Sequence, residues 1–528
     1  MLKFHTKSIR VNSNNLFISS LLLKRCFTEG FLLNKSIPQE TKDDLISRPD
    51  ATATLTTDYY EYQRVAHDSV KNFKATWLNA LAERKKQLKQ GKIIDSYVYN
   101  HIKSHDIVEK TRNESFAHVV LPFKENPIVA DFYVNAAGRI RIGQLFQDLD
   151  SLAGKIAYKH TAPVEPMIVT ASVDRIYLLK PIDSIADYNV ILSGSVIYTG
   201  RSSMEIAITA RATKNEVPKE ISEETLSDDD IFLTASFTFV ARNPETHKSL
   251  EINRLLPLNE KQWLDFKRAE SRIAAKKLNA SNSNLEKNPP TEEESLIIHQ
   301  LWSASKRLTS MPNKPSNVSF MKDTDVESTM FMQPQYRNRH SYMIFGGYLM
   351  RQTFELAYCS AASFSHSYPR FMSLDSTTFK TPVPVGSILH MNATVVYTEH
   401  VHKASNEQAK TGKDNSTVEE ANCNAVTDSQ PTAVNKLSFD KDSFLSKPGT
   451  LIQVKVDTTV QDLASTKKQQ SGSFIYSFFA PKDAVQEGTH SSGYSTVVPE
   501  TYSEMIEFIE GRRRATETAL YVRQVKEN

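Results

Sequence analysis

The stretch GQLFQDLDSLA at residues 143–153 has a counterpart later in the chain, GYLMRQTFELA at residues 347–357. Both stretches begin with glycine and carry apolar residues at helical spacing. A second pair of matching segments follows at the same separation of about 200 residues. These are Ser172-Val173-Asp174 and Ser373-Leu374-Asp375, each with a proline seven residues after its aspartate, at Pro181 and Pro382. We infer that the chain contains an internal duplication.

The order of the predicted elements also repeats, because each copy of the helix is followed by β-rich runs. The first half is predicted to contain a strand at 115–123, a helix at 143–160 and strands at 167–179, 188–198, 204–210 and 231–241. The second half is predicted to contain a helix at 346–363 and strands at 370–379, 387–398, 450–460 and 473–480. A helix followed by antiparallel strands suggests a sheet that curves around the helix. Two such sheets can join edge to edge, which removes an exposed edge from each.

The remaining segments differ in composition from these two halves. Residues 28–91 are predicted to form an N-terminal helical extension, with a helical pattern over 58–90 that ends at Gly91. Residues 271–295 are rich in Lys, Asn, Ser and Pro and are predicted to link the halves. Residues 401–436 are polar and poor in aromatic residues, which predicts a disordered insertion. The two domains are therefore expected at 92–270 and 296–525.

The chain begins with a segment typical of a mitochondrial transit peptide. Residues 1–27 carry five basic residues, no acidic residue and a broken apolar stretch. A flexible tail or a weak secretory signal is the alternative. Removing this segment takes the formal net charge from +3 to about −2. A nearly neutral body is not expected to bind nucleic acid, and no apolar run is long enough to predict a membrane span.

The chain has three cysteines, which are too few for a disulfide framework or a zinc quartet. Cys359 lies in the second predicted helix and is expected to be a core residue. His101 and His105 are four residues apart but have no third ligand nearby, so no metal site is predicted. A serine-hydrolase elbow of the form Gly-x-Ser-x-Gly is also missing from the sequence.

Two segments resemble those of acyl-CoA thioesterases with tandem hotdog domains, in particular their mitochondrial branch. The segments are GRIRIGQLFQDLDSLAG at 138–154 and PQYRNRH at 334–340 followed by IFGGYLM at 344–350. The resemblance implies an α+β fold of two fused hotdog domains, each a long helix wrapped by a curved antiparallel sheet. The two domains would form a pseudo-dimer within one chain. The resemblance also implies acyl-CoA as the substrate, fatty acid metabolism as the setting and a homo-oligomeric assembly.

Thioester hydrolysis needs an activated water and a group that stabilises the developing oxyanion. The resemblance assigns the first role to Asp150, which either activates water or attacks the carbonyl directly. Asn338 would orient the water or the thioester oxygen. The N–H groups of Gly346 or Gly347 would polarise the carbonyl, because the first N–H groups of a helix have no intrahelical acceptor. No metal or redox cofactor is required for this reaction.

Each half of the chain holds only half of this predicted site. The second half has Phe354 where the first has Asp150, and the first half has only Asn135 in place of Asn338. One complete site would therefore combine Asp150 with Asn338. The twin site would pair Phe354 or Glu355 with Asn135 and is predicted to be inactive.

Other residues near the motifs are predicted to contact the substrate. His340 lies two residues after Asn338 and is a candidate substrate contact, although a structural role is favoured for it. Coenzyme A carries phosphates, so basic residues should line the entrance to its site. The candidates for this role are Arg337, Arg339 and Lys380, together with Arg139 and Arg141, although most of them are as readily explained as exposed solubilising charges.

Other interpretations of these residues and of the function stay open. From spacing alone, Asp150 could be a solvated carboxylate, Asn338 a turn cap and the glycines packing residues. The protein as a whole could bind acyl-CoA without hydrolysing it, or act as a scaffold for a mitochondrial complex. An acyl-thioester hydratase or dehydratase is a further alternative, but no histidine lies near Asp150 on the first helix.

Overall fold

The computed structural model describes most of the chain from residue 106 onward. The described residues are 106–164, 166–244, 246–282, 285, 288–337, 343–375, 377–401, 448–463, 467–482 and 494–527. The predicted leader 1–27, the extension 28–91 and the insertion 401–436, apart from Val401, lie outside them. The paired histidines at positions 101 and 105 lie outside them as well. No helix in the described part is both long and apolar enough to cross a membrane.

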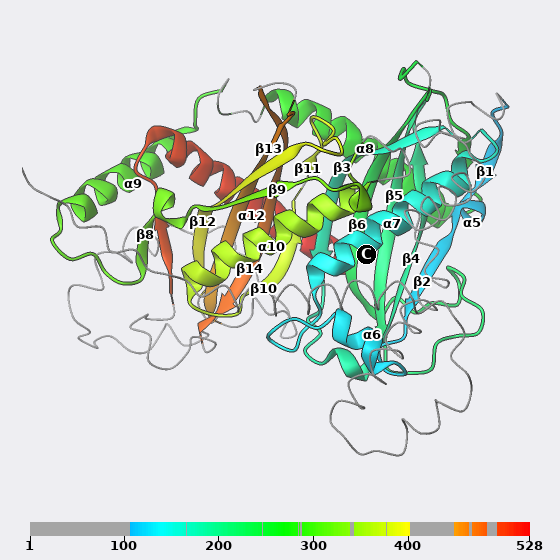
Figure 1. Ribbon diagram of the computed structural model, residues 1–528, viewed down its shortest axis with the longest axis horizontal. Helices are drawn as coiled ribbons and strands as arrows, with labels where there is room; N and C mark the ends of the chain where they lie inside the picture. Colours follow the sequence, from blue (N-terminus) through cyan, green and yellow to red (C-terminus); the bar gives the residue numbers. More distant parts are fainter. Residues whose placement is uncertain are drawn as a thin grey trace, which may run out of the picture. The chain divides into compact units, whose positions relative to one another are not determined.

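The first half consists of the helix α7 (Ile142–Thr161) packed on an antiparallel sheet (Figure 1). The strands of this half lie in the order β2-β4-β5-β6-β3. Their bounds are β2 (Ala117–Leu121), β3 (Met167–Leu178), β4 (Asn189–Thr199), β5 (Ser203–Thr213) and β6 (Ile231–Arg242). The predicted helix and strands are confirmed, and most of their ends shift by only one to three residues.

The second half repeats this arrangement around the helix α10 (Gly346–Ser365). Its strands lie in the order β9-β12-β13-β14-β10, which matches the first half strand for strand. Their bounds are β9 (Val326–Phe331), β10 (Arg370–Leu374), β12 (Ile388–Val401), β13 (Gly449–Gln461) and β14 (Lys468–Pro481). The predicted strand 370–379 is divided into β10 and the short β11 (Thr377–Thr378).

The two sheets join along the edges of β3 and β10 into one 11-stranded sheet of the described residues. Ser373 pairs with Tyr177, Leu374 pairs with Ile176, and β11 pairs with β3 further along. The predicted edge-to-edge union is therefore confirmed. The helices α7 and α10 contact each other and run side by side near the middle of the sheet in Figure 1. This contact places the middle of each helix against the beginning of the other.

The burial pattern explains why these segments form these elements. Strand β6 alternates between buried and partly exposed residues along most of its length, which is the period-2 pattern of a sheet strand. Helix α7 instead buries a stripe of residues three or four apart, namely Leu145, Leu149, Leu152 and Ile156. Phe146 of this helix packs edge-on against Phe354 and Phe371, at ring-centroid distances of 5.3 and 5.4 Å. Apolar contacts thus hold the two halves together beneath both helices.

Long helices of the described residues also lie outside the two repeats. Helix α8 (Glu260–Asn282) packs on β4, and α12 (Tyr502–Glu527) packs on β12 and on α9 (Glu292–Ser310). The segment 271–295, predicted to be a linker, contains the end of α8 and the start of α9. Helix α9 begins with a capping box in which Thr291 and Glu294 bond each other's backbone N–H groups.

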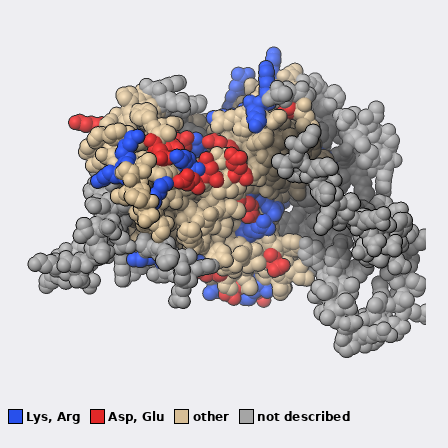
Figure 2. All heavy atoms as spheres, turned by 60° about the vertical axis from the view of Figure 1, so that its left-hand side comes forward, with Lys and Arg blue, Asp and Glu red and all other residues tan. Residues whose placement is uncertain are grey.

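The charged side chains on the face shown in Figure 2 are of both signs. Acidic and basic groups lie next to one another among a larger uncharged area. A nucleic-acid footprint would instead be a basic patch or stripe.

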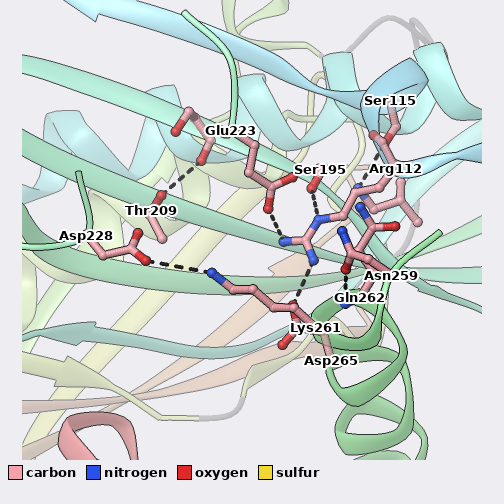
Figure 3. A network of polar contacts seen from close by, with 12 residues as sticks. Arg112, Ser115, Ser195, Thr209, Glu223, Asp228, Asn259, Lys261, Gln262 and Asp265 are labelled. Atoms are coloured by element: carbon pink, nitrogen blue, oxygen red, sulfur yellow. Dashed lines mark hydrogen bonds and ion pairs between the residues drawn. The ribbon is translucent and has the colours of Figure 1, made fainter. Parts of the chain in front are cut away.

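A polar network around Arg112 joins the short helix α5 (Arg112–Ser115) to β4, α8 and the loop before β6 (Figure 3). The Arg112 guanidinium donates to Ser195 on β4 at 2.8 Å and pairs with Asp265 on α8 at 2.7 Å. It also pairs with Glu223 in the loop before β6, at 2.6 Å. Only 11% of the Arg112 side chain is exposed, whereas its partners Glu223 and Asp265 are 33% and 27% exposed, so the cation is shielded from water more than the carboxylates are.

We expect Arg112→Ala to lower the free energy of unfolding by about 2 kcal/mol, because it leaves two carboxylates without their cation. Urea unfolding would measure the change. Arg254→Ala is the matched control, because its side chain is 72% exposed and lies 3.7 Å from Glu251. That control should cost less than about 0.5 kcal/mol. Equal effects of the two changes would show that the network adds nothing to stability.

Candidate functional site

Asp150 lies on α7 with its carboxylate against the first turn of α10. Its side chain is buried, and the residue is only 1% exposed. The backbone N–H of Gly347 donates a hydrogen bond to its Oδ2 at 2.6 Å. The N-terminus of a helix favours negative charge, because its first N–H groups point outward and the helix dipole is positive there. The structure thus joins a carboxylate of the first half to the glycine turn of the second.

The other carboxylate oxygen of Asp150 is held by the sheet. Thr170 on β3 donates a hydrogen bond from its hydroxyl to Oδ1 at 3.1 Å. Sequence reasoning missed Thr170, which lies 20 positions after Asp150 within a strand. Its place in the strand gives no signal by itself, because the register of β3 beneath α7 decides which side chain faces the carboxylate.

Burial raises the pKa of Asp150 from 3.8 to about 6, while the bonds from Gly347 and Thr170 lower it and so limit the rise. At neutral pH the group is therefore mostly an ionised carboxylate, and it can take up a proton within the pH range in which enzymes work. Such a pKa suits a general base.

The two glycines that open α10 leave space beside the carboxylate. A Cβ atom on Gly346 would lie 3.1 Å from Oδ2 of Asp150 and 3.6 Å from the ring of Phe379. A Cβ atom on Gly347 would lie 3.0 Å from the Cα of Gln147 on α7. Glycine at 347 therefore lets the two helices approach closely, and glycine at 346 keeps the space in front of Asp150 open.

A second carboxylate on α7 also has a raised pKa. Burial raises the pKa of Asp148 to about 7, although the hydroxyl of Tyr133 donates to its Oδ2 at 2.7 Å. Residues two apart on a helix point in different directions, so Asp148 and Asp150 lie on different faces of α7. Asp148 is a rival candidate for the base, but it accepts its bond from a tyrosine rather than from the glycine turn.

Several predicted site residues lie outside the described part of the chain, namely Asn338, Arg339 and His340. The residues that flank them are described: Arg337 pairs with Ile344 in an isolated bridge, as Val134 pairs with Ile140 in the first half. Asn338 and Asn135 therefore follow equivalent bridge positions in the sequence. This match supports the alignment of the two halves, although their loops differ by one residue.

Two other residues predicted to contact the substrate, Arg337 and Lys380, donate hydrogen bonds to acceptors within the protein. Arg337 is 6% exposed and donates to the carbonyl of Pro334 at 3.1 Å. Lys380 directly follows Phe379, and its ammonium donates to Gln470 at 2.8 Å. Lys380 is thus next to a residue that borders the site, whereas the side chain of Arg337 is buried.

At the twin position the start of α7 lies against Phe354 and Glu355 of α10, and the Glu355 carboxylate there is paired with an arginine. Phe354 is 5% exposed and belongs to the aromatic cluster between the halves. The carboxylate of Glu355 pairs with Arg141, at 2.8 Å. Asn135 uses its Oδ1 to accept from the N–H groups of Ala137 and Arg139, both at 3.0 Å. The first half's helix therefore faces an apolar ring and a neutralised acid at this position.

Comparison with known proteins finds related sequences but no matching family profile. Acyl-coenzyme A thioesterase 9, mitochondrial, of Mus musculus is 30% identical over 327 residues, which cover 60% of this chain and 70% of the relative. Acyl-coenzyme A thioesterase 2, chloroplastic, of Humulus lupulus is 35% identical over 302 residues, which cover 56% of this chain and 66% of the relative.

Coverage differs among the other relatives. The chain spans 55% of a second Humulus lupulus relative, acyl-coenzyme A thioesterase 4, mitochondrial, so it spans less than two thirds of either plant protein. Among solved structures, the acyl-CoA hydrolase of Staphylococcus aureus is 22% identical, with a TM-score of 0.27. That match covers 34% of this chain and 94% of the hydrolase.

Proposed function

Because the chain belongs to the acyl-coenzyme A thioesterase family, we propose that it hydrolyses acyl-CoA thioesters to carboxylic acids and coenzyme A. The observation that carries the proposal is the buried Asp150 carboxylate, held 2.6 Å from the Gly347 N–H at the start of α10. The site combines the two halves of the chain, so one composite site serves the whole protein.

In the proposed reaction, Asp150 takes a proton from a water molecule that attacks the thioester carbonyl. The water oxygen adds to the carbonyl carbon and gives a tetrahedral oxyanion. As this intermediate collapses the C–S bond breaks, and the proton held by Asp150 passes to the sulfur of the leaving coenzyme A. Direct attack by the carboxylate is the alternative: the C–S bond breaks, coenzyme A leaves as a thiolate and a mixed anhydride forms. Water then cleaves the anhydride to the carboxylic acid and the Asp150 carboxylate, and a proton released in this step restores the thiol. In both cases the N–H of Gly346 is the group we assign to the oxyanion, because Asp150 already occupies the N–H of Gly347.

Asn338 would orient the water or the thioester oxygen from the loop before α10. Arg339 and Lys380 would contact the phosphates of coenzyme A. His340 stays a candidate substrate contact, and the buried Arg337 is a weaker candidate than its neighbours.

The proposed setting is the mitochondrial matrix, for which the basic leader is the support. Relatives from mouse and hop also carry mitochondrial names. We further propose a homo-oligomer, as the tandem hotdog resemblance implies. Light scattering of the protein lacking residues 1–27 would test the assembly.

The test of the activity is release of free thiol from acyl-CoAs of increasing chain length. Hydrolysis of at least one chain length above the spontaneous rate would support the proposal. If well-folded protein bound these compounds and released no thiol from any of them, the acyl-CoA-binding function would replace it.

We expect the rate of hydrolysis to depend on pH as the ionisation of Asp150 does. Because burial sets the pKa of Asp150 at about 6, kcat/KM should level off above that pH. Below pH 6 it should fall about tenfold for each further pH unit, since the protonated acid cannot accept a proton. Stopped-flow thiol detection between pH 5 and pH 8 would measure this profile. A flat profile across that range would contradict the assignment.

Thr170→Val should move this profile to higher pH, because the hydroxyl stabilises the ionised form of Asp150. We expect a shift of up to about one pH unit, which corresponds to 1.36 kcal/mol. If Asp148 were the base instead, the profile of this variant would stay at the wild-type position. Thr238→Val is the matched control, because its hydroxyl bonds Asp174 and not Asp150.

A further inference from the structure

A cavity of about 340 Å³ lies at the twin position, between the two halves. The first half contributes the turn 134–142 before α7, and the second half contributes Phe354 and Glu355 of α10. The cavity thus occupies the pseudo-symmetric equivalent of the space beside Asp150. Its volume is near the lower end of the range of small-ligand sites, roughly 300 to 1,000 Å³.

The walls of this cavity are mainly apolar. Ile140, Leu178, Phe354 and Phe371 line it, and each of them is buried in the protein. An apolar space between two packed helices and a sheet can take up an alkyl chain, because each buried CH₂ group gains about 0.8 kcal/mol.

Three arginines border the same cavity, and two of them have acidic partners. Arg141 pairs with Glu355 at 2.8 Å, and Arg370 pairs with Asp183 at 2.6 Å. Arg139 donates to the carbonyl of Tyr368 at 3.2 Å, and no carboxylate of the described residues forms an ion pair with it. Burial, together with the nearby Arg370, lowers the pKa of Arg139. An anion at this place would relieve both effects.

A thioester bound in this cavity would meet no unpaired carboxylate among the described residues that line it. Phe354 stands in the place of the aspartate, and the carboxylate of Glu355 is neutralised by Arg141. The side-chain Oδ1 of Asn135 already accepts hydrogen bonds from two backbone N–H groups of its own turn. The cavity therefore has apolar walls and a cation that can bind a ligand, but its described lining has no equivalent of Asp150 to hydrolyse one.

We propose that the twin cavity is a second, non-hydrolytic binding site for an apolar chain with an anionic head group that pairs with Arg139. The ligand class rests on the proposed function, since the reaction supplies two such molecules: the acyl-CoA and the free carboxylate. A ligand in this site would contact both α7, which carries Asp150, and α10, which carries the glycine turn.

Calorimetric titration of the full chain tests this proposal with two probes. One probe is the non-hydrolysable thioether octyl-CoA, and the other is octanoate. The composite site should bind the first probe, so a second equivalent of octyl-CoA per chain would show that the twin cavity takes substrate. An event with octanoate that depends on Arg139 would show that the cavity takes product.

Arg139→Glu should weaken the second event by about 30-fold or more, because it replaces the cation with a like charge. Ala136→Trp, at the exposed mouth of the cavity, should block the event through bulk instead of charge. Arg201→Glu, an exposed arginine outside the lining, is the control and should leave binding unchanged.

A single equivalent of octyl-CoA with no binding of octanoate would overturn the proposal. So would a second event of unchanged affinity in both Arg139→Glu and Ala136→Trp. Thiol release measured on the same preparations separates the two functions. Hydrolysis without a second binding event would support the composite site and contradict the twin site. A second binding event that depends on Arg139, without hydrolysis, would support the twin site and contradict the proposed activity.

Discussion

Asp150→Ala is expected to lower kcat/KM for acyl-CoA hydrolysis by about 10³-fold, because it removes the group that activates water or attacks the carbonyl. The structure places this carboxylate between the Gly347 N–H and the Thr170 hydroxyl, with no other acid bonded to either group in the described residues. Thiol release under single-turnover conditions would measure the loss in the chemical step separately from product release.

The Asp150→Ala protein should remain folded. The pKa of Asp150 in the folded protein is about 6, above its ordinary value of 3.8, so the ionised form opposes folding at neutral pH. Protonation favours the folded state, and this contribution is complete below pH 3.8 and lost as the pH rises through 6. Removing the carboxylate therefore costs no electrostatic stability at pH 7. Circular dichroism melting would check the fold of the variant.

Asp148→Asn is the matched control for this variant, since it changes the other perturbed carboxylate of α7. An asparagine can still accept the hydrogen bond from Tyr133. We expect kcat/KM within about threefold of wild type. A large loss in Asp148→Asn combined with an active Asp150→Ala would move the base to Asp148.

Gly347→Ala is expected to damage both stability and activity. The added Cβ would lie 2.8 Å from the ring of Phe345 and 3.0 Å from the Cα of Gln147, so the ring must shift and the two helices must move apart slightly. Overpacking of this kind costs about 2 kcal/mol of unfolding free energy. Displacing the Gly347 N–H from Asp150 should also lower kcat/KM by about 10²-fold. Urea unfolding and thiol release would measure the two effects.

Gly154→Ala is the control for this change, because a Cβ atom there meets nothing within 4 Å. Alanine in the interior of α7 should raise the free energy of unfolding by about 0.5 kcal/mol and leave activity unchanged. If Gly347→Ala behaved like Gly154→Ala, the close contact between the two helices would not be needed for the site.

The repeated helices and most strands could be predicted because their apolar residues recur with a clear period. The union of the sheets followed from the duplication and from the cost of an open edge. The meeting of Asp150 with the glycine turn of the other half was implied by the resemblance to tandem hotdog thioesterases. The roles assigned to these residues in hydrolysis stay predictions.

Other features depend on tertiary contacts that a sequence does not display. Helix α12 contains Gly511, which disfavours a helix in isolation. A Cβ atom there would lie 2.5 Å from Tyr397 on β12, so the close packing of the helix accounts for the glycine. Strand β9 was also missed; it lies at an edge and alternates only between exposed and partly exposed residues.

The surroundings of two side chains on α10, Cys359 and Phe354, could not be predicted from the sequence alone. Cys359 was predicted to be core and is exposed, so this prediction was wrong. The apolar character of the helix hides an outward face on which Cys359 lies. Phe354 occupies the position equivalent to Asp150 and is part of the aromatic cluster, which explains how an apolar residue could replace a carboxylate there.

A double-mutant cycle on Asp150 and Asn338 tests the composite site most directly, because the two residues come from different halves of the chain. If both act on one thioester, Asp150→Ala and Asn338→Ala should each lower kcat/KM by about 10²-fold or more. The kcat/KM of the double variant should then be only slightly below that of the less active single variant, because the effects of residues that act as a unit are not additive. Full activity in either single variant, or losses that multiply in the double variant, would contradict a single site shared by the two halves.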